Sequence, residues 1–434
     1  MKQTCHFLIG AASSGGGKTT FTTGMLRLLH NRGLNIQPFK CGPDYIDTKY
    51  HEMASGHPSV NLDLWLSSDQ HIKLLYADYA AKQDVCVTEG VMGLFDGYDG
   101  MHGSSAEIAS LLDIPVILVI NAQSTAYTVA PILYGFKHFN PSICLAGVVF
   151  NQVASERHYS YLLQACADVG VTSFGYLPRL KELEVPSRHL GLTLDTLSEF
   201  DQYADRIAQV IEEHIDVNRL IQTCSSALTD RPIPSKHNAT TGKLRIAVAR
   251  DAAFNFIYKE NLSRLEEWGT VTFFSPMADA ALPESDLVYL PGGYPEFFLK
   301  ELEANRTLKE QLRDYVESGG RLLAECGGMM YLCDAIQDND GKFYPMVGLL
   351  HQTATMQNMR LRLGYRSFQL NGQKWKGHEF HYSSIQDASQ IPSIATLTDA
   401  RGQEVATPIY RYKNMIAGYT HLYWGENDLM KLWD

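Results

Sequence analysis

The chain of 434 residues lacks the features of several large classes of protein. It has 37 lysines and arginines against 48 aspartates and glutamates, which gives a formal net charge of -11. Proteins that bind nucleic acid usually carry a basic stripe, so we expect no nucleic-acid partner. The longest clearly apolar run, IPVILVI, is far shorter than the roughly 20 residues needed to cross a bilayer, so we expect no membrane partner either.

The cysteine spacing and the N-terminal segment argue against two further classes of protein. No CxxC pair occurs, which argues against a structural zinc site. The N-terminal segment MKQTCHFLIGAASSGGGK has neither the apolar core nor the cleavage site of a secretory signal. We therefore expect a cytoplasmic protein with reduced thiols. The eight cysteines are Cys5, Cys41, Cys86, Cys144, Cys166, Cys224, Cys326 and Cys333.

Two series of short β-rich runs are separated by segments of helical length. The first contains CHFLIGA, LNIQPFK, DVCVTEG, IPVILVIN and LAGVVFNQV, and the second contains LRIAVAR, VTFFS, SDLVYLPGG and GRLLAEC. This alternation indicates βαβ units and parallel sheets, so the predicted fold class is α/β. The stretch SSALTDRPIPSKHNATTGK between them lacks apolar periodicity. We predict domains over 1–216 and 244–434, a linker over 217–243, and more strands and turns from about residue 344.

A glycine-rich loop follows the first predicted strand and precedes a predicted helix. Backbone N–H groups in such a loop point at phosphate oxygens, and the helix N-terminus favours negative charge. Lys18 would reach the β- and γ-phosphates of a nucleotide, and Thr19 would hold Mg²⁺. The strict pattern has glycine where this chain has Ala12; the alternative is a glycine-rich turn with a surface lysine. The predicted ATP-binding residues here are Ser14, Gly15, Gly16, Gly17, Lys18, Thr19 and Thr20.

Four carboxylates follow predicted strands. Asp44 and Asp47 occur in KCGPDYIDTKYH, whereas Glu89 ends an apolar strand and Asp96 follows seven residues later. Open α/β sheets bind ligands at the carboxyl ends of their strands, and Mg²⁺ prefers carboxylate and phosphate oxygens. We predict Thr19, Asp44 and Glu89 as Mg²⁺ ligands and place Asp47 and Asp96 at substrate activation. For Asp44 and Asp47 the alternative is ordinary turn chemistry.

Three further polar residues are weaker candidates. Asn151 ends the predicted strand GVVFNQV, where its amide could read a nucleotide base or simply cap the strand. Arg188 and His189, in VPSRHLGL, could receive an anionic substrate or belong to a solvated loop.

The stretch RLLAECGGMMYLC places Cys326 between a predicted strand and two glycines. Cysteine in such a turn is either a small core residue or a nucleophile, and a helix N-terminus would lower its thiol pKa. Gly292, Gly293 and Gly327 could supply backbone donors to an oxyanion and hold the substrate of this nucleophile. A nucleophile needs a base, and residue pattern alone leaves four candidates, His351, His378, His381 and His421.

These motifs occur in one order along almost the whole chain. The glycine-rich loop with Lys18 and Thr19, KCGPDYID, EGVMGLFDG, VPSRHLGL, LPGGYPE, ECGGMMYL, GHEFHYS and THLYW resemble those of the cobyrinate a,c-diamide synthases, ATP- and glutamine-dependent enzymes of cobalamin biosynthesis. The resemblance implies an N-terminal P-loop NTPase domain of the dethiobiotin-synthetase type and a C-terminal class I glutamine amidotransferase domain. The nickel-sirohydrochlorin a,c-diamide synthases of coenzyme F430 synthesis share this architecture.

The resemblance also implies roles for individual residues. Cys326 would attack the glutamine amide, and His421 would be its base. Many class I amidotransferases have a glutamate two residues after that histidine, but this chain has Tyr423, so Glu379 is a candidate to orient His421. The implied partners are ATP with Mg²⁺, glutamine and a tetrapyrrole carboxylate, and the assemblies to consider include a homodimer. Two rival functions are a P-loop regulatory ATPase with an inert amidotransferase-like domain and a cobyric acid synthase.

Overall fold

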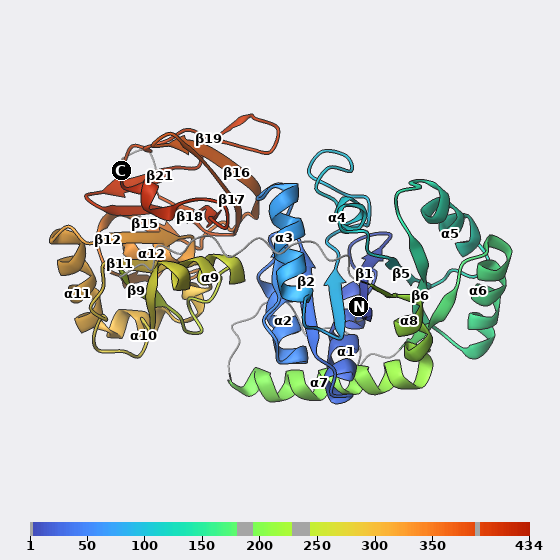
Figure 1. Ribbon diagram of the computed structural model, residues 1–434. Coiled ribbons are helices and arrows are strands. Elements are labelled where there is room, and N and C mark those ends of the chain that lie inside the picture. The colour runs from blue at the N-terminus through green and yellow to red at the C-terminus, as the bar shows by residue number, and fades with distance from the viewer. Residues whose placement is uncertain (1–2, 180–193, 228–243, 387–390) are drawn as a thin grey trace. The chain divides into compact units, whose positions relative to one another are not determined.

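The computed structural model describes residues 3–179, 194–227, 244–386 and 391–434 (Figure 1). Contacts divide the chain into an N-terminal unit, Met1–Pro234, and a C-terminal unit, Ser235–Asp434. Within the described ranges, no helix combines the length and the apolar composition that crossing a membrane requires.

The N-terminal unit is built around an eight-stranded sheet. Seven strands run parallel in the order β3-β2-β4-β1-β5-β6-β7, and β8 pairs antiparallel with β1. The strands are β1 (Gln3–Ala11), β2 (Ile36–Cys41), β3 (Val60–Leu62), β4 (Val85–Glu89), β5 (Val116–Asn121), β6 (Leu145–Val153), β7 (Ser173–Pro178) and β8 (Ser225–Ala227). The helices are α1 (Lys18–Asn31), α2 (Ile46–Ser55), α3 (Asp69–Ala80), α4 (Ser105–Leu112), α5 (Val129–His138), α6 (Glu156–Val169), α7 (Leu194–His214) and α8 (Val217–Thr223).

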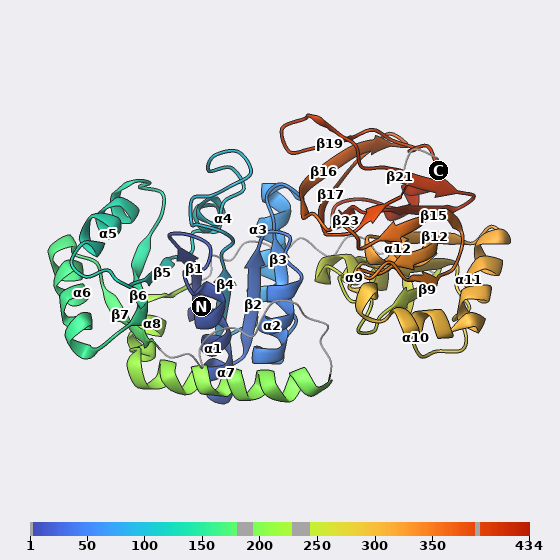
Figure 2. The same ribbon diagram turned by 180° about the vertical axis from the view of Figure 1, so that it is seen from behind.

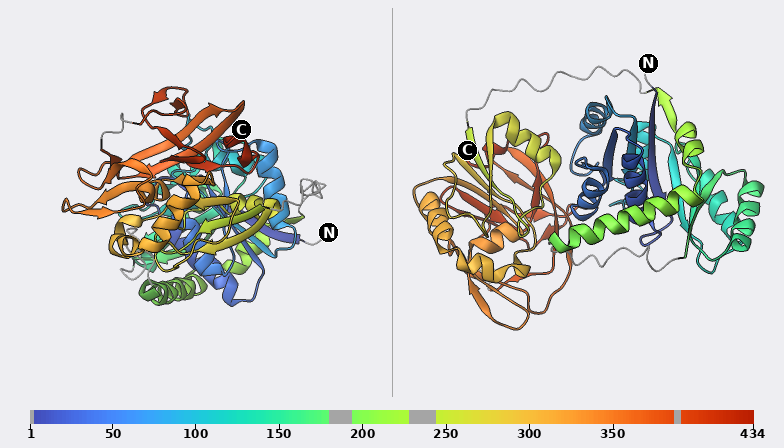
Figure 3. Two further views of the ribbon diagram at one scale, coloured as in Figure 1. Left: turned by 90° about the vertical axis from the view of Figure 1, so that its left-hand side faces the viewer. Right: turned by 90° about the horizontal axis from the view of Figure 1, so that it is seen from below.

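Helices cover both faces of this sheet because its central strands are apolar on both sides. In β1, Phe7 and Ile9 pack with α1, α2, α7 and α8, whereas Leu8 packs with α3 to α6 on the opposite face. Helix α7 lies alongside α1 (Figure 3). Serine side chains cap α3, α4 and α6 by accepting a backbone N–H in the first turn of each helix. This doubly wound arrangement brings the carboxyl ends of β1, β2 and β4 together.

The predicted linker over 217–243 begins too early. Residues 217–227 form α8 and β8, and β8 extends the sheet by pairing with β1 through Gln3↔Ala227 and Cys5↔Ser225. Val217 and Leu220 are buried in the core, so this short helix belongs to the N-terminal unit. Sequence composition hid this because the apolar residues of α8 are too few to form a periodic pattern.

The described residues of the C-terminal unit form three sheets. A six-stranded sheet has the order β10-β9-β11-β12-β22-β21, a five-stranded sheet β20-β19-β16-β17-β23, and a four-stranded sheet β14-β13-β15-β18. The strands are β9 (Leu244–Ala249), β10 (Gly269–Phe274), β11 (Leu287–Leu290), β12 (Arg321–Glu325), β13 (Cys333–Gln337), β14 (Phe343–Pro345), β15 (Leu350–Thr355), β16 (Arg362–Leu370), β17 (Gln373–His381), β18 (Ser384–Ile385), β19 (Leu397–Thr398), β20 (Glu404–Val405), β21 (Ile409–Tyr412), β22 (Met415–Gly418) and β23 (His421–Tyr423). The helices are α9 (Lys259–Trp268), α10 (Leu299–Ala304), α11 (Arg306–Glu317) and α12 (Gly327–Leu332), with short 3-10 turns η2 (Pro295–Phe297) and η4 (Leu429–Leu432).

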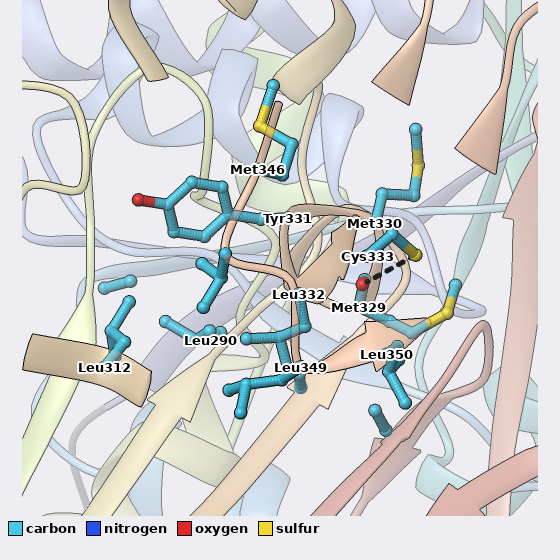
Figure 4. Close-up of a cluster of buried hydrophobic side chains, with 14 of the residues drawn as sticks. Leu290, Leu312, Met329, Met330, Tyr331, Leu332, Cys333, Met346, Leu349 and Leu350 are labelled. Carbon is cyan, nitrogen blue, oxygen red and sulfur yellow. Dashed lines mark hydrogen bonds between the residues drawn. The ribbon is translucent and has the colours of Figure 1, made fainter. Parts of the chain in front are cut away.

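The central strands of the six-stranded sheet are buried on both faces. Tyr289 and Leu323 pack on one face with Phe368 and Trp375 of the five-stranded sheet. Figure 2 shows strands of both sheets, β16 and β17 of the five-stranded sheet and β9 and β12 of the six-stranded sheet. On the other face, a cluster of large apolar side chains joins α11 and α12 to the strands; it includes Leu290, Leu312, Met329, Met330, Leu332, Met346, Leu349 and Leu350 (Figure 4). Helix α12 begins directly after Cys326, so this cluster anchors the turn in which Cys326 lies.

Candidate active sites

The phosphate loop connects β1 to α1. Gly17 is the N-cap residue of α1 and has a left-handed backbone, with φ of 102°. A methyl group at Gly17 would lie 2.1 Å from Asn151 Nδ2, so both conformation and space require glycine there. Asn151 Nδ2 donates to Gly16 O at 3.2 Å. Asn151 therefore supports the loop from inside β6, which continues to Val153 and does not end at Asn151 as expected.

The side chains of the loop differ in exposure. Ser14 and Gly15 are exposed, whereas Lys18, Thr19 and Thr20 are buried in the first turn of α1. Lys18 Nζ donates a hydrogen bond to Met92 O. The segment carrying Met92 packs against the phosphate loop, since Leu94 N donates to Ala11 O at 2.8 Å.

Thr19 meets a buried charged network at the carboxyl ends of β2 and β4. Thr19 Oγ1 donates to Glu89 Oε1 at 2.8 Å. Lys40 Nζ lies 3.2 Å from the same oxygen and 2.7 Å from Asp47 Oδ2. Because Lys40 and Glu89 are register partners on adjacent strands, the sheet itself brings them together. The sequence pattern brought out Thr19, Asp47 and Glu89 but missed Lys40, although a lysine inside a buried strand is unusual.

Two more side chains complete this network. His51 Nε2 and Glu89 Oε2 are 2.7 Å apart. Asp44 Oδ1 accepts the backbone N–H groups of Ile46 and Asp47 at 2.8 and 2.9 Å, so it caps the start of α2. No local pattern marks His51, because it lies in the middle of a helix and meets Glu89 only through folding.

Opposite charges control ionisation in the network. Burial disfavours the charged form of Glu89, but Lys40, His51 and Thr19 outweigh it and hold its pKa well below the usual range. Burial also opposes the charge of Lys40, yet Asp47, Glu89 and Asp44 raise its pKa above the ordinary value. Asp47 behaves differently, because burial and Asp44 raise its pKa to about 6 although Lys40 opposes this. The ion pair that the site firmly holds is therefore the Glu89 carboxylate with the Lys40 ammonium group.

The donor set fits Mg²⁺ only in part. The Thr19 hydroxyl and the Glu89 carboxylate are hard oxygen ligands that lie together beside the phosphate loop. Within the described ranges, no group of three or more His, Cys, Asp or Glu side chains is arranged to hold a metal ion. Asp96 is exposed, and its Oδ2 accepts Gly93 N at 2.9 Å, which closes a turn. Arg188 and His189 lie outside the described residues.

Cys326 occupies a strained turn between β12 and α12. Its φ and ψ are 49° and -109°, a region that non-glycine residues rarely adopt. Cys326 N donates to Gly418 O at 2.7 Å, which ties the turn to the end of β22. The predicted lowering of its pKa is wrong: burial raises the pKa of the thiol, with Glu296 adding to the effect, although the Gly327 N–H acts in the opposite direction. Helix α12 has only six residues, so its N-terminus cannot offset this burial.

His421 and Gly327, the residue after Cys326, both adjoin the loop of Gly292 and Gly293. A methyl group at Gly292 would lie 2.2 Å from His421 Cε1. A methyl group at Gly327 would lie 3.1 Å from Gly293 O and 3.2 Å from Gly293 N. His421 starts β23, three residues after Gly418. Burial lowers the pKa of His421 well below its ordinary value, with His378 and His381 adding to the effect, so its imidazole is neutral.

The other histidines have different surroundings. His378 is the cross-strand partner of His421; their rings stack with centroids 5.1 Å apart, and the Tyr258 hydroxyl is 2.7 Å from His378 Nδ1. His381 stacks on Tyr419 with centroids 3.7 Å apart. His351 is exposed and pairs with Asp334. His421 is therefore the candidate base that adjoins the glycine loop.

Two buried glutamates on neighbouring strands contact the residues on either side of His421 in the chain. Glu379 accepts a hydrogen bond from Thr420 Oγ1 at 3.1 Å and pairs with Arg366 at 2.9 Å. Glu325, which sequence reasoning missed, accepts Leu422 N at 3.0 Å. Both carboxylates thus contact residues next to His421 in the chain.

Comparison with known proteins finds a matching family domain for each half of the chain. Residues 7–192 match the CobQ/CobB/MinD/ParA nucleotide binding domain, and residues 245–429 match the CobB/CobQ-like glutamine amidotransferase domain. A cobyrinate a,c-diamide synthase of Dehalococcoides mccartyi (strain CBDB1) is 39% identical over 98% of this chain and 96% of that protein. The cobyrinate a,c-diamide synthase of Caldanaerobacter subterraneus subsp. tengcongensis is 39% identical over 96% and 94% of the two chains. The hydrogenobyrinate a,c-diamide synthase of Pseudomonas aeruginosa is 38% identical over 97% and 94%.

These matches confirm the α/β fold class, with a P-loop nucleotide-binding domain followed by a glutamine amidotransferase domain. They also confirm the family resemblance that the ordered motifs indicated. From the two domains and the near full-length similarity, we conclude that the chain belongs to the cobyrinate a,c-diamide synthase family.

Proposed function

We propose that this protein uses ATP and glutamine to convert the a- and c-acetate carboxylates of cobyrinate to amides. The observation that carries the proposal is the turn of Cys326. The backbone of Cys326 has a left-handed φ of 49°, and helix α12 begins directly after it. This turn adjoins the loop of Gly292 and Gly293, which in turn adjoins His421. A regulatory ATPase with an inert second domain has no need of such a strained turn.

The N-terminal unit would activate the carboxylate. A carboxylate is a poor acyl electrophile, so one of its oxygens attacks the γ-phosphorus of ATP, ADP leaves, and an acyl phosphate forms. Lys18 would turn from Met92 O to the phosphates and stabilise the charge on the transferred group. Thr19 and Glu89 would hold Mg²⁺, which neutralises phosphate charge when bound. Lys40, which pairs with both Asp47 and Glu89, would hold the Glu89 carboxylate in place.

The C-terminal unit would supply ammonia. The thiol of Cys326 passes its proton to neutral His421 as sulfur attacks the amide carbon of glutamine, and backbone N–H groups of the glycine turns stabilise the oxyanion. His421 returns the proton to the leaving nitrogen, so ammonia departs and a thioester remains. Water then hydrolyses the thioester to glutamate. Ammonia attacks the acyl phosphate, and phosphate leaves.

Product analysis tests the substrate. The purified protein, with ATP, Mg²⁺ and glutamine, is offered cobyrinate, hydrogenobyrinate and nickel-sirohydrochlorin in separate reactions, and mass spectrometry counts the amidations. We expect a diamide from cobyrinate. A diamide formed only from nickel-sirohydrochlorin would assign the sister activity, and absence of any amide would refute the proposal. Sedimentation of the same preparation tests whether the protein forms a homodimer.

The division into two sites is tested with Cys326→Ala. This variant is expected to lose glutamine-driven amidation and to keep amidation driven by added ammonium salt. Cys144→Ala is the matched control, because Cys144 is an exposed thiol in the N-terminal unit. Failure of ammonium to rescue Cys326→Ala, with a folded variant and an active control, would contradict the division.

A further inference from the structure

Strand β23, which carries His421, is the last strand of the five-stranded sheet. On its inner edge it pairs with β17, where His378 lies opposite His421. On its outer edge, side chains bind its backbone. Asn261 Nδ2 donates to Leu422 O at 2.8 Å, and Trp424 N donates to Asn261 Oδ1 at 2.9 Å. The position of the candidate base therefore depends on contacts that a neighbouring strand would normally provide.

Glu325 provides the remaining contact at Leu422. Leu422 N donates to Glu325 Oε1 at 3.0 Å, and the Tyr289 hydroxyl lies 2.7 Å from Glu325 Oε2. Glu325 is 1% exposed and is the last residue of β12, directly before Cys326. One side chain thus joins the residue before the nucleophile to the residue after the base, across 97 positions and two different sheets.

This arrangement differs from a carboxylate that binds the imidazole directly. The position that carries a glutamate in many amidotransferases is Tyr423 here. Glu379, on the other side of His421, contacts Thr420 and is already paired with Arg366. Of the two glutamates, Glu325 is the one that lies on β12, the strand that ends directly before Cys326.

We propose that Glu325 is a positioning residue that holds the backbone of β23 so that the His421 imidazole stays aligned with Cys326. The inference rests on the proposed glutaminase role of that pair. It assigns Glu325 no contact with substrate. It requires an acceptor at Oε1, because without one the buried Leu422 N–H has no partner from β12 and the strand end is free to shift.

The surroundings of Glu325 show which substitution should preserve this function. Burial raises the pKa of Glu325 to about 8, even though Tyr289 and Leu422 oppose that effect. One oxygen of Glu325 accepts the Leu422 N–H, and the other is bonded to the Tyr289 hydroxyl. Glutamine has the same shape, accepts through its carbonyl, and can donate to a hydroxyl that rotates. Methionine fills the same space and accepts no such bond.

The experiment compares Glu325→Gln with Glu325→Met in the full chain. Glutamate release from glutamine is measured with all substrates present, and amidation driven by ammonium salt is measured in parallel. We expect Glu325→Met to lower kcat for glutamine by about 10- to 100-fold, because displacement near 1 Å has effects of this size, with little change in KM. Glu325→Gln should stay within about threefold of the parent and keep the same pH profile between pH 6 and 8. Ammonium-driven amidation should survive in both variants.

Two controls separate positioning from folding. Tyr289→Phe keeps the Leu422 contact and should retain glutaminase activity. Lys309→Met removes another buried polar group of the same unit, which binds Glu303 O and Pro345 O and not β23, and should also retain it. If Glu325→Met does not fold, Glu325→Asp takes its place, since the shorter acid cannot span to Leu422 and should be impaired while Glu325→Gln is not.

Normal kcat in Glu325→Met, or equal impairment of Glu325→Gln and Glu325→Met, would overturn the proposal. Loss of ammonium-driven amidation together with glutaminase in the folded Glu325→Met variant would also overturn it, since that would indicate general damage. Failure of the proposed function gives a different result. In that case the parent protein itself releases no glutamate, or Cys326→Ala still does.

Discussion

Replacing Gly292 with alanine adds one methyl group directly against the imidazole of His421. That methyl would lie 2.2 Å from Cε1, 2.9 Å from Nδ1 and 3.2 Å from Nε2. Carbon atoms reach their best separation at about 3.5 Å, so the ring must withdraw by roughly 1.3 Å. Gly292 has no left-handed backbone, so alanine there brings no backbone strain, and the three atoms nearest the added methyl all belong to His421.

A displacement of that size should be severe for glutamine hydrolysis. Misplacement by about 1 Å can cost about 100-fold in rate, equivalent to about 2.7 kcal/mol of activation free energy. We therefore expect Gly292→Ala to lose at least about 100-fold of glutamine-driven glutamate release. Amidation with ammonium salt should remain near the parent value, because Gly292 belongs to the C-terminal unit and the ATP site does not.

The assay measures glutamate release and amide formation in the same reactions, with circular dichroism as the check on folding. Gly135→Ala is the matched control, since a methyl group there meets nothing within 4 Å and Gly135 also lacks a left-handed backbone. A folded Gly292→Ala variant with normal glutaminase activity would refute the assignment of His421 as the base beside this glycine.

Two other predictions concern charge. Lys18→Ala should lower both glutamine- and ammonium-driven amidation by at least about 100-fold, while glutamate release persists. Lys137→Ala is the control, because Lys137 binds backbone oxygens away from the phosphate loop. Full amidation in Lys18→Ala would refute the assignment of the phosphate loop. Burial lowers the pKa of His378 to about 3, whereas the unfolded chain binds this proton near pH 6.5, so its contribution to stability is present above pH 6.5 and is lost as pH falls toward 3. In urea titrations, the free energy of unfolding of the parent minus that of His378→Asn should therefore fall by about 2 kcal/mol from pH 7 to pH 5. If this free-energy difference does not change with pH, the His378 ring is not buried in its neutral form.

Local sequence patterns located the central parallel strands of both units, but not the individual strands after about residue 333. Every quoted β-rich run of both halves is a strand, because short apolar runs bounded by turn residues are the direct requirement of a buried parallel sheet. Patterns failed at 217–227, where a short helix and a three-residue strand carry too little periodicity to detect. They also ended the strand of Asn151 two residues early.

The candidate sites were predictable to the extent that each motif is contiguous. Lys18 and Thr19, Glu89, and Cys326 with its two glycines each stand in a local pattern with a chemical reason. Lys40, His51 and Glu325 do not, because their partners are distant in sequence: Lys40 and Glu89 are 49 positions apart, and Glu325 and Leu422 are 97 apart. The pKa of Cys326 was mispredicted for a related reason, since the length of α12 and the burial of the thiol appear only after folding.

The sequence by itself determined the two α/β halves, the phosphate loop, the cysteine turn and the family, because each depends on the type and spacing of residues that are neighbours in the chain. Only the tertiary structure decided which charges surround Glu89, why Gly292 must lack a side chain, and that Glu325 reaches the strand of His421. Those properties depend on burial and on strand register, which bring together residues that no local pattern connects.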